Sequence, residues 1–318
     1  MNHHPPSSVK IWIAIISVYL VWGSTYLAIR FAVQTMPPFL MASVRFLISG
    51  SLLYIVRRVG GDPKPTRLEW RSASIIGIFL LVGGNGGVVW AEQWVVSGVA
   101  ALLVATAPLW MILIDTLHPR GRKSGPKVIL GVMLGFSGIL ILIHPFQSIN
   151  QGDIDLIGAL VILLASFFWS IGSLYSRQAK LPSSPLLGIG MEMLAGGMGL
   201  LLLGILSGEL RQLSWASISQ ESWLGLTYLI VFGSLIGFTA YTWLLRTAPT
   251  PLVSTYAYVN PIVAVLLGYF IAEEPLTFRI LFAAVLVVGS VALISITQQR
   301  ALRSKGTPLK SSEKGGMD

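Results

Sequence analysis

A stripe of aromatic side chains that ends in an arginine follows one face of the first long apolar run. Tyr19, Trp22, Tyr26 and Arg30 recur at spacings of three and four residues, so they lie on the same side of a helix. Aromatic rings stack planar or apolar solutes and bind cations through their faces. A helix that carries such a stripe inside a membrane should turn it toward protein or water. The pattern therefore predicts a solute-binding wall rather than a centre of covalent chemistry.

A second stripe of the same spacing appears 147 positions later, where Ser166, Trp169, Ser173 and Arg177 share a face. Trp22 and Trp169 both fall near the middle of their apolar runs, so we expect them to form two walls of one cavity. The arginines fall at opposite ends of their helices. We interpret them as markers of the helix ends or as gates rather than as ligands of a substrate.

The candidate substrate-binding residues are aromatic or polar side chains within the apolar runs or near their ends. They are Tyr19, Trp22, Ser24, Thr25, Tyr26, Asn85, Trp169, Ser173, Tyr241, Tyr256, Tyr258 and Asn260. Two other interpretations stay open. Interfacial aromatic belts account for many Trp and Tyr residues of membrane proteins, and Asn85 within Gly83–Gly87 suits helix packing as well as substrate contact. Pro108 and Pro261 are expected to kink their helices.

Four charged residues are candidates for coupling or gating: Arg45, Glu192, Arg30 and Glu92. Arg45 and Glu192 lie deep in apolar runs, where a charge is costly and needs a partner or water. Each also has a purely structural interpretation. Arg45 could donate hydrogen bonds to helix-end carbonyls, and Glu192 could be a hydrogen-bonded structural glutamate. Their opposite depths argue against a direct pair. Arg30 can simply extend to the interface, and Glu92 reads as an exposed carboxylate at a helix end.

The composition excludes several function classes. Of the 318 residues, 54% are hydrophobic and 11% charged, with a mean hydropathy of +0.75, whereas soluble domains carry about 25% charged residues. There is no cysteine, which excludes disulfides and thiolate metal sites. No paired histidine ligands or nucleophile elbow appear, so we expect no enzyme activity, metal or cofactor. The net charge of +9 is explained by loop charges of a membrane protein rather than by nucleic-acid binding.

Ten apolar runs of about the length needed to cross a bilayer follow one another with short connections. They lie near 11–33, 38–57, 71–92, 97–117, 126–145, 155–178, 184–207, 221–245, 251–272 and 277–297. Alternate loops and tails hold 18 of the 22 Lys and Arg residues, while the opposite loops hold only Arg211 and Arg279. By the positive-inside rule both termini are cytoplasmic. The segments 1–10 and 298–318 are expected to be tails, the second one disordered.

The two stripes belong to a longer internal repeat. The offset of 147 also aligns Pro38 with Pro185, and an offset of 153 aligns Trp90 with Trp243. Two halves of five helices, 11–145 and 155–297, are implied. Because five is odd, the second half enters the membrane from the opposite side. The fold class expected is therefore an all-α integral membrane protein of ten helices in two inverted repeats, an arrangement common in secondary transporters.

A set of short motifs occurs in one order across both halves, over about residues 10–297. In chain order they are Trp22-Gly23-Ser24-Thr25-Tyr26, Ala28-Ile29-Arg30, Arg45-Phe46, Ala91-Glu92-Gln93-Trp94, Ala100-Ala101-Leu102-Leu103, Ala107-Pro108-Leu109, Asn260-Pro261 and Glu273-Glu274-Pro275. This order resembles the EamA-type drug/metabolite transporters. The resemblance implies a central cavity, lined mainly by helices 1, 3, 4, 6, 8 and 9, and export of small metabolites, amino acids or drugs. The basic loop at 120–127 departs from the acidic motif of the second half.

The leading hypothesis is a secondary exporter in a cytoplasmic membrane, which the short loops and the resemblance suggest is bacterial. It would move aromatic or amphipathic solutes by alternating access, driven by the solute gradient or by protons. A passive metabolite channel and a membrane scaffold that transports nothing are the alternatives. The expected partners are the lipid bilayer, a small-molecule substrate and protons. The sequence leaves the oligomeric state open and is compatible with a monomer.

Overall fold

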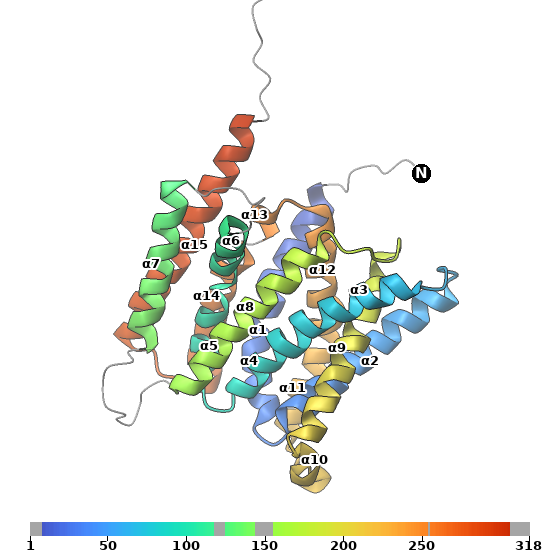
Figure 1. Cartoon of the computed structure of the whole chain (residues 1–318). Helices are drawn as coiled ribbons and strands as arrows, with labels where there is room; N and C mark the ends of the chain where they lie inside the picture. The colour runs from blue at the N-terminus through green and yellow to red at the C-terminus, as the bar shows by residue number, and fades with distance from the viewer. Residues whose placement is uncertain (1–7, 118–124, 144–154, 254, 306–318) are drawn as a thin grey trace, which may run out of the picture.

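The chain forms a bundle of helices in this computed structural model, which describes residues 8–117, 125–143, 155–253 and 255–305. No strand occurs in those ranges. The N-terminal end of α1 and the C-terminal end of α15 lie at the same side of the bundle, opposite the short helix α10 (Figure 1). Helices α7 and α15 run side by side at one flank (Figure 1).

The described parts of the ten predicted apolar runs are mostly helical. The first half contains α1 (Ser8–Val33), α2 (Pro38–Val59), α3 (Arg67–Gly77), η1 (Ile78–Asn85), α4 (Gly86–Ala91), α5 (Ser97–Val104), α6 (Ala107–Leu117) and α7 (Pro126–Ile143). The second half contains α8 (Leu156–Ser176), α9 (Pro185–Leu206), α10 (Glu209–Gln212), η2 (Trp215–Ser217), α11 (Gln220–Tyr228), η3 (Leu229–Phe238), α12 (Thr239–Thr247), α13 (Thr250–Val253), α14 (Tyr256–Ala272) and α15 (Phe278–Lys305).

Among the described residues, eight helical segments are long and apolar enough to cross a membrane. Two further apolar helices, Tyr256–Ala272 and Phe278–Ile294, are shorter. The chain is thus a multi-pass membrane protein. Helix α15 continues to Lys305, so the start of the segment expected to be disordered, 298–318, is helical. Residues 1–7 and 306–318 of the two expected tails, and most of the basic loop at 120–127, lie outside the described residues.

Local sequence signals explain where several helices begin. Thr66 accepts a hydrogen bond from the Glu69 amide, and the Glu69 side chain accepts one from the Thr66 amide, which together form the capping box of α3. Pro38 and Pro185 occupy the first turns of α2 and α9, where a missing N–H costs nothing. The fourth predicted run is interrupted at Ala105 and Thr106, just before Pro108, whereas α14 continues through Pro261.

Helices α2 and α9 pack along each other and are tied at both ends. Beyond the end of α9, the Glu209 carboxylate accepts hydrogen bonds from the Leu40 and Phe39 amides at 2.9 and 3.2 Å, which caps α2. Burial raises the pKa of Glu209, and these two hydrogen bonds oppose the shift. At the other end, Arg57 of α2 pairs with Asp62 at 2.7 Å, and its Nε also donates to Ser184 Oγ, directly before α9, at 3.2 Å.

Candidate functional site

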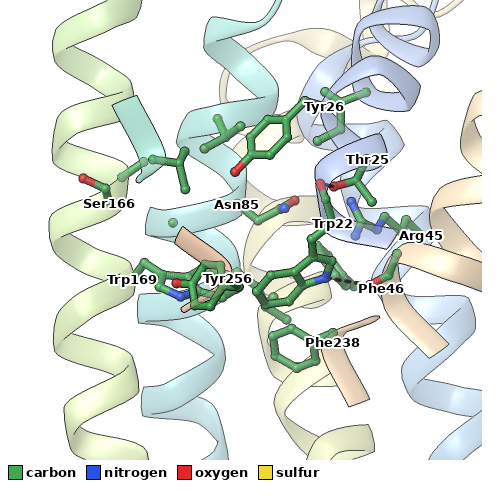
Figure 2. Close-up of a pocket in the computed structure, with 17 residues that line it drawn as sticks. Trp22, Thr25, Tyr26, Arg45, Phe46, Asn85, Ser166, Trp169, Phe238 and Tyr256 are labelled. Atoms are coloured by element: carbon green, nitrogen blue, oxygen red, sulfur yellow. Dashed lines mark hydrogen bonds between the residues drawn. The ribbon is translucent and has the colours of Figure 1, made fainter. Parts of the chain in front are cut away.

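A cavity of about 60 Å³ lies between helices of both halves of the chain. Its walls come from α1, α2, η1, α4 and α5 of the first half and from α8, η3 and α14 of the second. The lining residues are Trp22, Thr25, Tyr26, Ile29, Arg45, Phe46, Leu81, Gly84, Asn85, Val88, Val104, Ala165, Ser166, Trp169, Gly233, Phe238 and Tyr256. Figure 2 shows ten of them as labelled side chains around the cavity.

Aromatic rings form one wall of this cavity. The ring centroids of Trp22 and Trp169 are 5.4 Å apart in an edge-to-face arrangement, and Tyr256 lies 5.5 Å from Trp22. Tyr241 packs behind them, 4.7 Å from Trp22. Its hydroxyl accepts a hydrogen bond from Trp169 Nε1 at 3.1 Å and shares another with Ser173 at 2.7 Å. The rings are therefore held in fixed orientations, which suits the stacking of a planar solute.

The glycine-rich segment at 83–87 brings this wall close to the helices of the first half. It closes the π-helical segment η1, where the wider turn departs from α geometry. A Cβ atom at Gly84 would come within 2.9 Å of the Trp169 ring, so only glycine lets α8 approach this closely. Asn85 follows and reaches the cavity, as Figure 2 shows.

Polar groups occupy separate parts of the lining. Ser166 Oγ lies 2.8 Å from Thr106 Oγ1 and accepts a hydrogen bond from Trp110 Nε1 at 3.0 Å, so it is engaged by the protein. Thr25 donates to the Trp22 carbonyl at 2.7 Å. Arg45 is only 3% exposed, and its Nε donates to Ser234 Oγ at 2.8 Å. Arg45 is the one charged side chain among the lining residues that the structure describes.

The structure places the twelve candidate substrate-binding residues in two groups. Six line the cavity: Trp22, Thr25, Tyr26, Asn85, Trp169 and Tyr256. The other six are Tyr19, Ser24, Ser173, Tyr241, Tyr258 and Asn260, none of which is among the lining residues. Ser173 and Tyr241 support the aromatic wall from behind.

The remaining four candidates lie outside the cavity lining. They are Tyr19, Ser24, Tyr258 and Asn260. Tyr19 shares a hydrogen bond with Thr255 at 2.5 Å, and Ser24 shares one with Tyr228 at 2.6 Å. With its amide oriented to satisfy both groups, Asn260 donates to the Tyr19 and Tyr256 carbonyls at 3.1 and 3.3 Å, which joins α14 to α1. Tyr258 is half-buried against the bundle core.

Two of the four candidate coupling residues form ion pairs that the sequence did not reveal. Glu192 is 1% exposed and pairs with Arg246 at 3.3 Å, not with Arg45. Arg30 pairs with Glu274 at 2.9 Å. Glu274 also accepts hydrogen bonds from Ser97 N and Oγ at 2.9 and 2.7 Å, which caps α5.

Glu92 differs from the sequence-based expectation. The sequence suggested an exposed carboxylate at a helix end, but Glu92 is only 3% exposed, and neither of its oxygens has a hydrogen-bond partner among the described residues. It follows the last residue of α4, yet neighbouring helices cover this end. The charges of Arg30, Arg45 and Glu274 act on it electrostatically. Burial of a helix end depends on tertiary packing, which a membrane-edge position in the sequence does not encode.

Sequence reasoning missed much of the apolar lining. Leu81, Val88, Val104 and Ala165 are ordinary apolar residues of apolar runs, and no local signal separates them from residues that face lipid. Phe238 had a usable signal, because it stands 153 positions after Asn85, the offset that also aligns Trp90 with Trp243. No group of three potential metal ligands occurs among the described residues. The lining suits noncovalent binding of a solute through its aromatic rings and the Arg45 guanidinium.

Comparison with known proteins agrees with this architecture. The family model described as the EamA-like transporter family matches residues 9–144 and 156–296. The Escherichia coli K12 protein named as an uncharacterized inner membrane transporter, YedA, is 37% identical over 284 residues, covering 89% of this chain and 90% of its own. A Bacillus subtilis protein named as an uncharacterized transporter, YoaV, is 24% identical and covers 92% and 99%.

A crystal structure of a protein that shares 20% sequence identity has the same fold, with a TM-score of 0.65 over 93% of this chain and 99% of that one. The two matched segments of the family model together span nearly all of the chain, and they meet at the cavity. The chain therefore belongs to the EamA-like transporter family and is a membrane transporter of that type.

Proposed function

We propose that the protein is a secondary transporter that exports small aromatic or amphipathic solutes from the cytoplasm by alternating access through the central cavity. The observation that carries this proposal is the composition of the cavity wall, which both family-matched halves build together. A site at the interface of two halves changes its access when one half rocks against the other. Seven aromatic or polar side chains that the sequence singled out, Trp22, Thr25, Tyr26, Arg45, Asn85, Trp169 and Tyr256, meet there.

An inverted repeat of two five-helix halves fits this mechanism. The two π-helical segments support it, since η1 ends at Asn85 and η3 at Phe238, a separation of 153 residues. The same offset aligns Trp90 with Trp243 in the sequence. Both π segments line the cavity. Related backbone distortions at matching places in two halves are expected of a duplicated unit.

The distribution of positive charge supports a cytoplasmic location for both termini. The loops on the side of the termini hold 18 of the 22 basic residues. The name of the Escherichia coli relative supports a bacterial inner membrane as the location. In this orientation Arg30 and Glu274 lie toward the outside and Arg246 toward the cytoplasm.

The Arg30–Glu274 ion pair is a candidate closing contact at the outer end. It joins α1 of the first half to the segment after α14 of the second, and Glu274 extends the contact to α5. Tyr26 and Ile29, which line the cavity, lie next to Arg30 on α1. We infer that opening to the outside separates Arg30 from Glu274.

Counterflow in proteoliposomes tests the proposed carrier. Vesicles that contain the protein are loaded with one unlabelled solute, and uptake of the labelled solute is followed for amino acids, cationic dyes, nucleobases and aromatic acids. A carrier gives uptake that is accelerated by the internal solute, whereas a channel does not. Absence of flux for the whole panel, against empty vesicles, would contradict the proposal.

Replacement of Glu192 by glutamine is expected to remove the pH dependence of transport. One Glu192 oxygen contacts Arg246, while the other, Oε2, is buried without a partner, so a proton there would cancel the charge that holds Arg246. Glutamine imitates the protonated state permanently. The measurement is initial transport rate against pH for the wild type, Glu192→Gln and the exposed control Glu221→Gln. An unchanged pH profile in Glu192→Gln would remove this residue as the coupling site.

A further inference from the structure

We propose that the central cavity binds organic anions, specifically aromatic acids whose carboxylate docks on Arg45. This inference rests on the proposed transport function and adds the chemical class of the substrate. Arg45 contributes the one formal charge among the described lining residues, and it is positive. Aromatic rings line the rest of the cavity, with Trp22 and Phe46 near Arg45 and with Trp169 and Tyr256 farther from it (Figure 2). A ligand complementary to both is a planar body with one acid group.

The guanidinium of Arg45 is held in place on three sides. Its Nε donates to Ser234 Oγ at 2.8 Å, and its central carbon lies 4.6 Å from the centroid of the Phe46 ring. Gly233 lies against Nη2 and leaves room for it, because a Cβ atom at that position would come within 2.8 Å of this nitrogen. A guanidinium fixed in this way binds an acid group with little loss of side-chain entropy.

One end of the guanidinium is left for a ligand. Arg45 Nη1 is buried and has no hydrogen-bond partner in the described protein, although the residue lines the cavity. A buried cationic donor without a partner is costly, and an incoming carboxylate would supply both the charge and the acceptor. Glu92 acts on Arg45 electrostatically but makes no hydrogen bond with it and does not line the cavity.

The other polar atoms of the lining argue against a cationic or zwitterionic ligand. No carboxylate is present among the described lining residues, so an ammonium group would be buried with neutral acceptors only. The available group is Asn85 Oδ1, which is buried and has no hydrogen-bond partner among the described residues. It suits a neutral hydroxyl or amide donor on the ligand. A single negative charge therefore fits the cavity better than a positive one.

Binding to the purified full-length protein tests this inference directly. The probes are two aromatic acids, phenylacetate and indole-3-acetate, with their neutral amides and with phenethylamine and phenylalanine. Binding is followed by isothermal titration calorimetry, because indole-3-acetate carries the same fluorophore as Trp22 and Trp169 of the lining. We expect each acid to bind at least about tenfold more tightly than its amide, as a charge-assisted hydrogen bond implies. Equal affinities, or failure of both acids to bind, would overturn the inference.

Variants of Arg45 test whether this residue causes the preference for an acid over its amide. Arg45→Gln is expected to abolish the preference for acid over amide, and Arg45→Lys to retain part of it. Arg211→Gln removes the same charge from an exposed position on α10 and is expected to change nothing. Should Arg45→Gln not fold, Ser234→Ala replaces it, because this change frees Nε while keeping the charge and should reduce the preference. An unchanged preference in the Arg45 or Ser234 variants would overturn the inference.

Counterflow separates this inference from the transport proposal. Selective binding of the acids without counterflow supports the anion site and contradicts the carrier. Counterflow that favours the amides, the amine or phenylalanine over the acids supports the carrier and contradicts the anion site. Counterflow selective for the acids supports both.

Discussion

Replacement of Trp169 by alanine is expected to weaken substrate binding by roughly tenfold or more while leaving expression near the wild-type level. The ring forms the cavity wall together with Trp22, 5.4 Å away, and is oriented by a hydrogen bond to Tyr241. An aromatic pair contributes about 0.5–1.5 kcal/mol beyond the buried area, and truncation also removes the area that a solute would cover. The measurement is the affinity of a transported solute together with the yield of monodisperse protein.

The matched control for this variant is Trp215→Ala. Trp215 also contacts another tryptophan, Trp223, at a centroid distance of 6.5 Å, but it is exposed and is not one of the lining residues. It should lose neither affinity nor yield. If Trp169→Ala lowers the yield while the surviving protein keeps its affinity, the ring serves packing and not the substrate.

Replacement of Gly77 by alanine is expected to destabilise the fold more than any single change on the helix surface. Gly77 ends α3 at the point where it crosses α9. A Cβ atom there would collide with the Glu192 carbonyl and approach the Gly196 amide to 2.9 Å. Both are backbone atoms and cannot rotate away, so α3 and α9 must separate. Overpacking of this kind costs about 1–3 kcal/mol.

Thermal denaturation in detergent, followed by the loss of the monodisperse peak, measures this effect. Gly289→Ala is the control, since no atom lies within 4 Å of a Cβ at that position in α15. Equal stability of the two variants would show that α3 and α9 separate at no cost. Gly77→Ala and Gly289→Ala make the same chemical change, but only at Gly77 would the new methyl group meet a neighbouring helix.

Much of the fold could be predicted from the sequence because membrane helices follow local rules. Apolar runs of sufficient length and proline at the first turn of α2 placed the helices to within a few residues. The stripes that contain Trp22 and Trp169 predicted two walls of one cavity; both rings line the cavity, but they lie in edge-to-face contact and form a single wall. These features depend on spacing along one helix and on a repeat that the sequence carries twice.

What the sequence could not predict depends on contacts between segments far apart in the chain. The pairing of Glu192 with Arg246 and of Arg30 with Glu274 joins residues 54 and 244 positions apart, and no local pattern encodes either pair. The burial of Glu92 has the same origin. The apolar half of the cavity lining was equally hidden, because a leucine that faces a cavity and one that faces lipid look alike in the sequence.

The two π-helical segments have a consequence for how the cavity can change shape. A π turn contains about one residue more than an α turn, so a π segment inside a helix shifts the angular positions of all residues that follow it. If η1 or η3 relaxed to α geometry, the flanking helix would rotate by about 100° relative to the rest. Asn85 and Phe238, at the ends of these segments, would then swing out of the lining. In each half, a change from π to α geometry in this segment would exchange the side chains that face a solute while the membrane helix stays continuous.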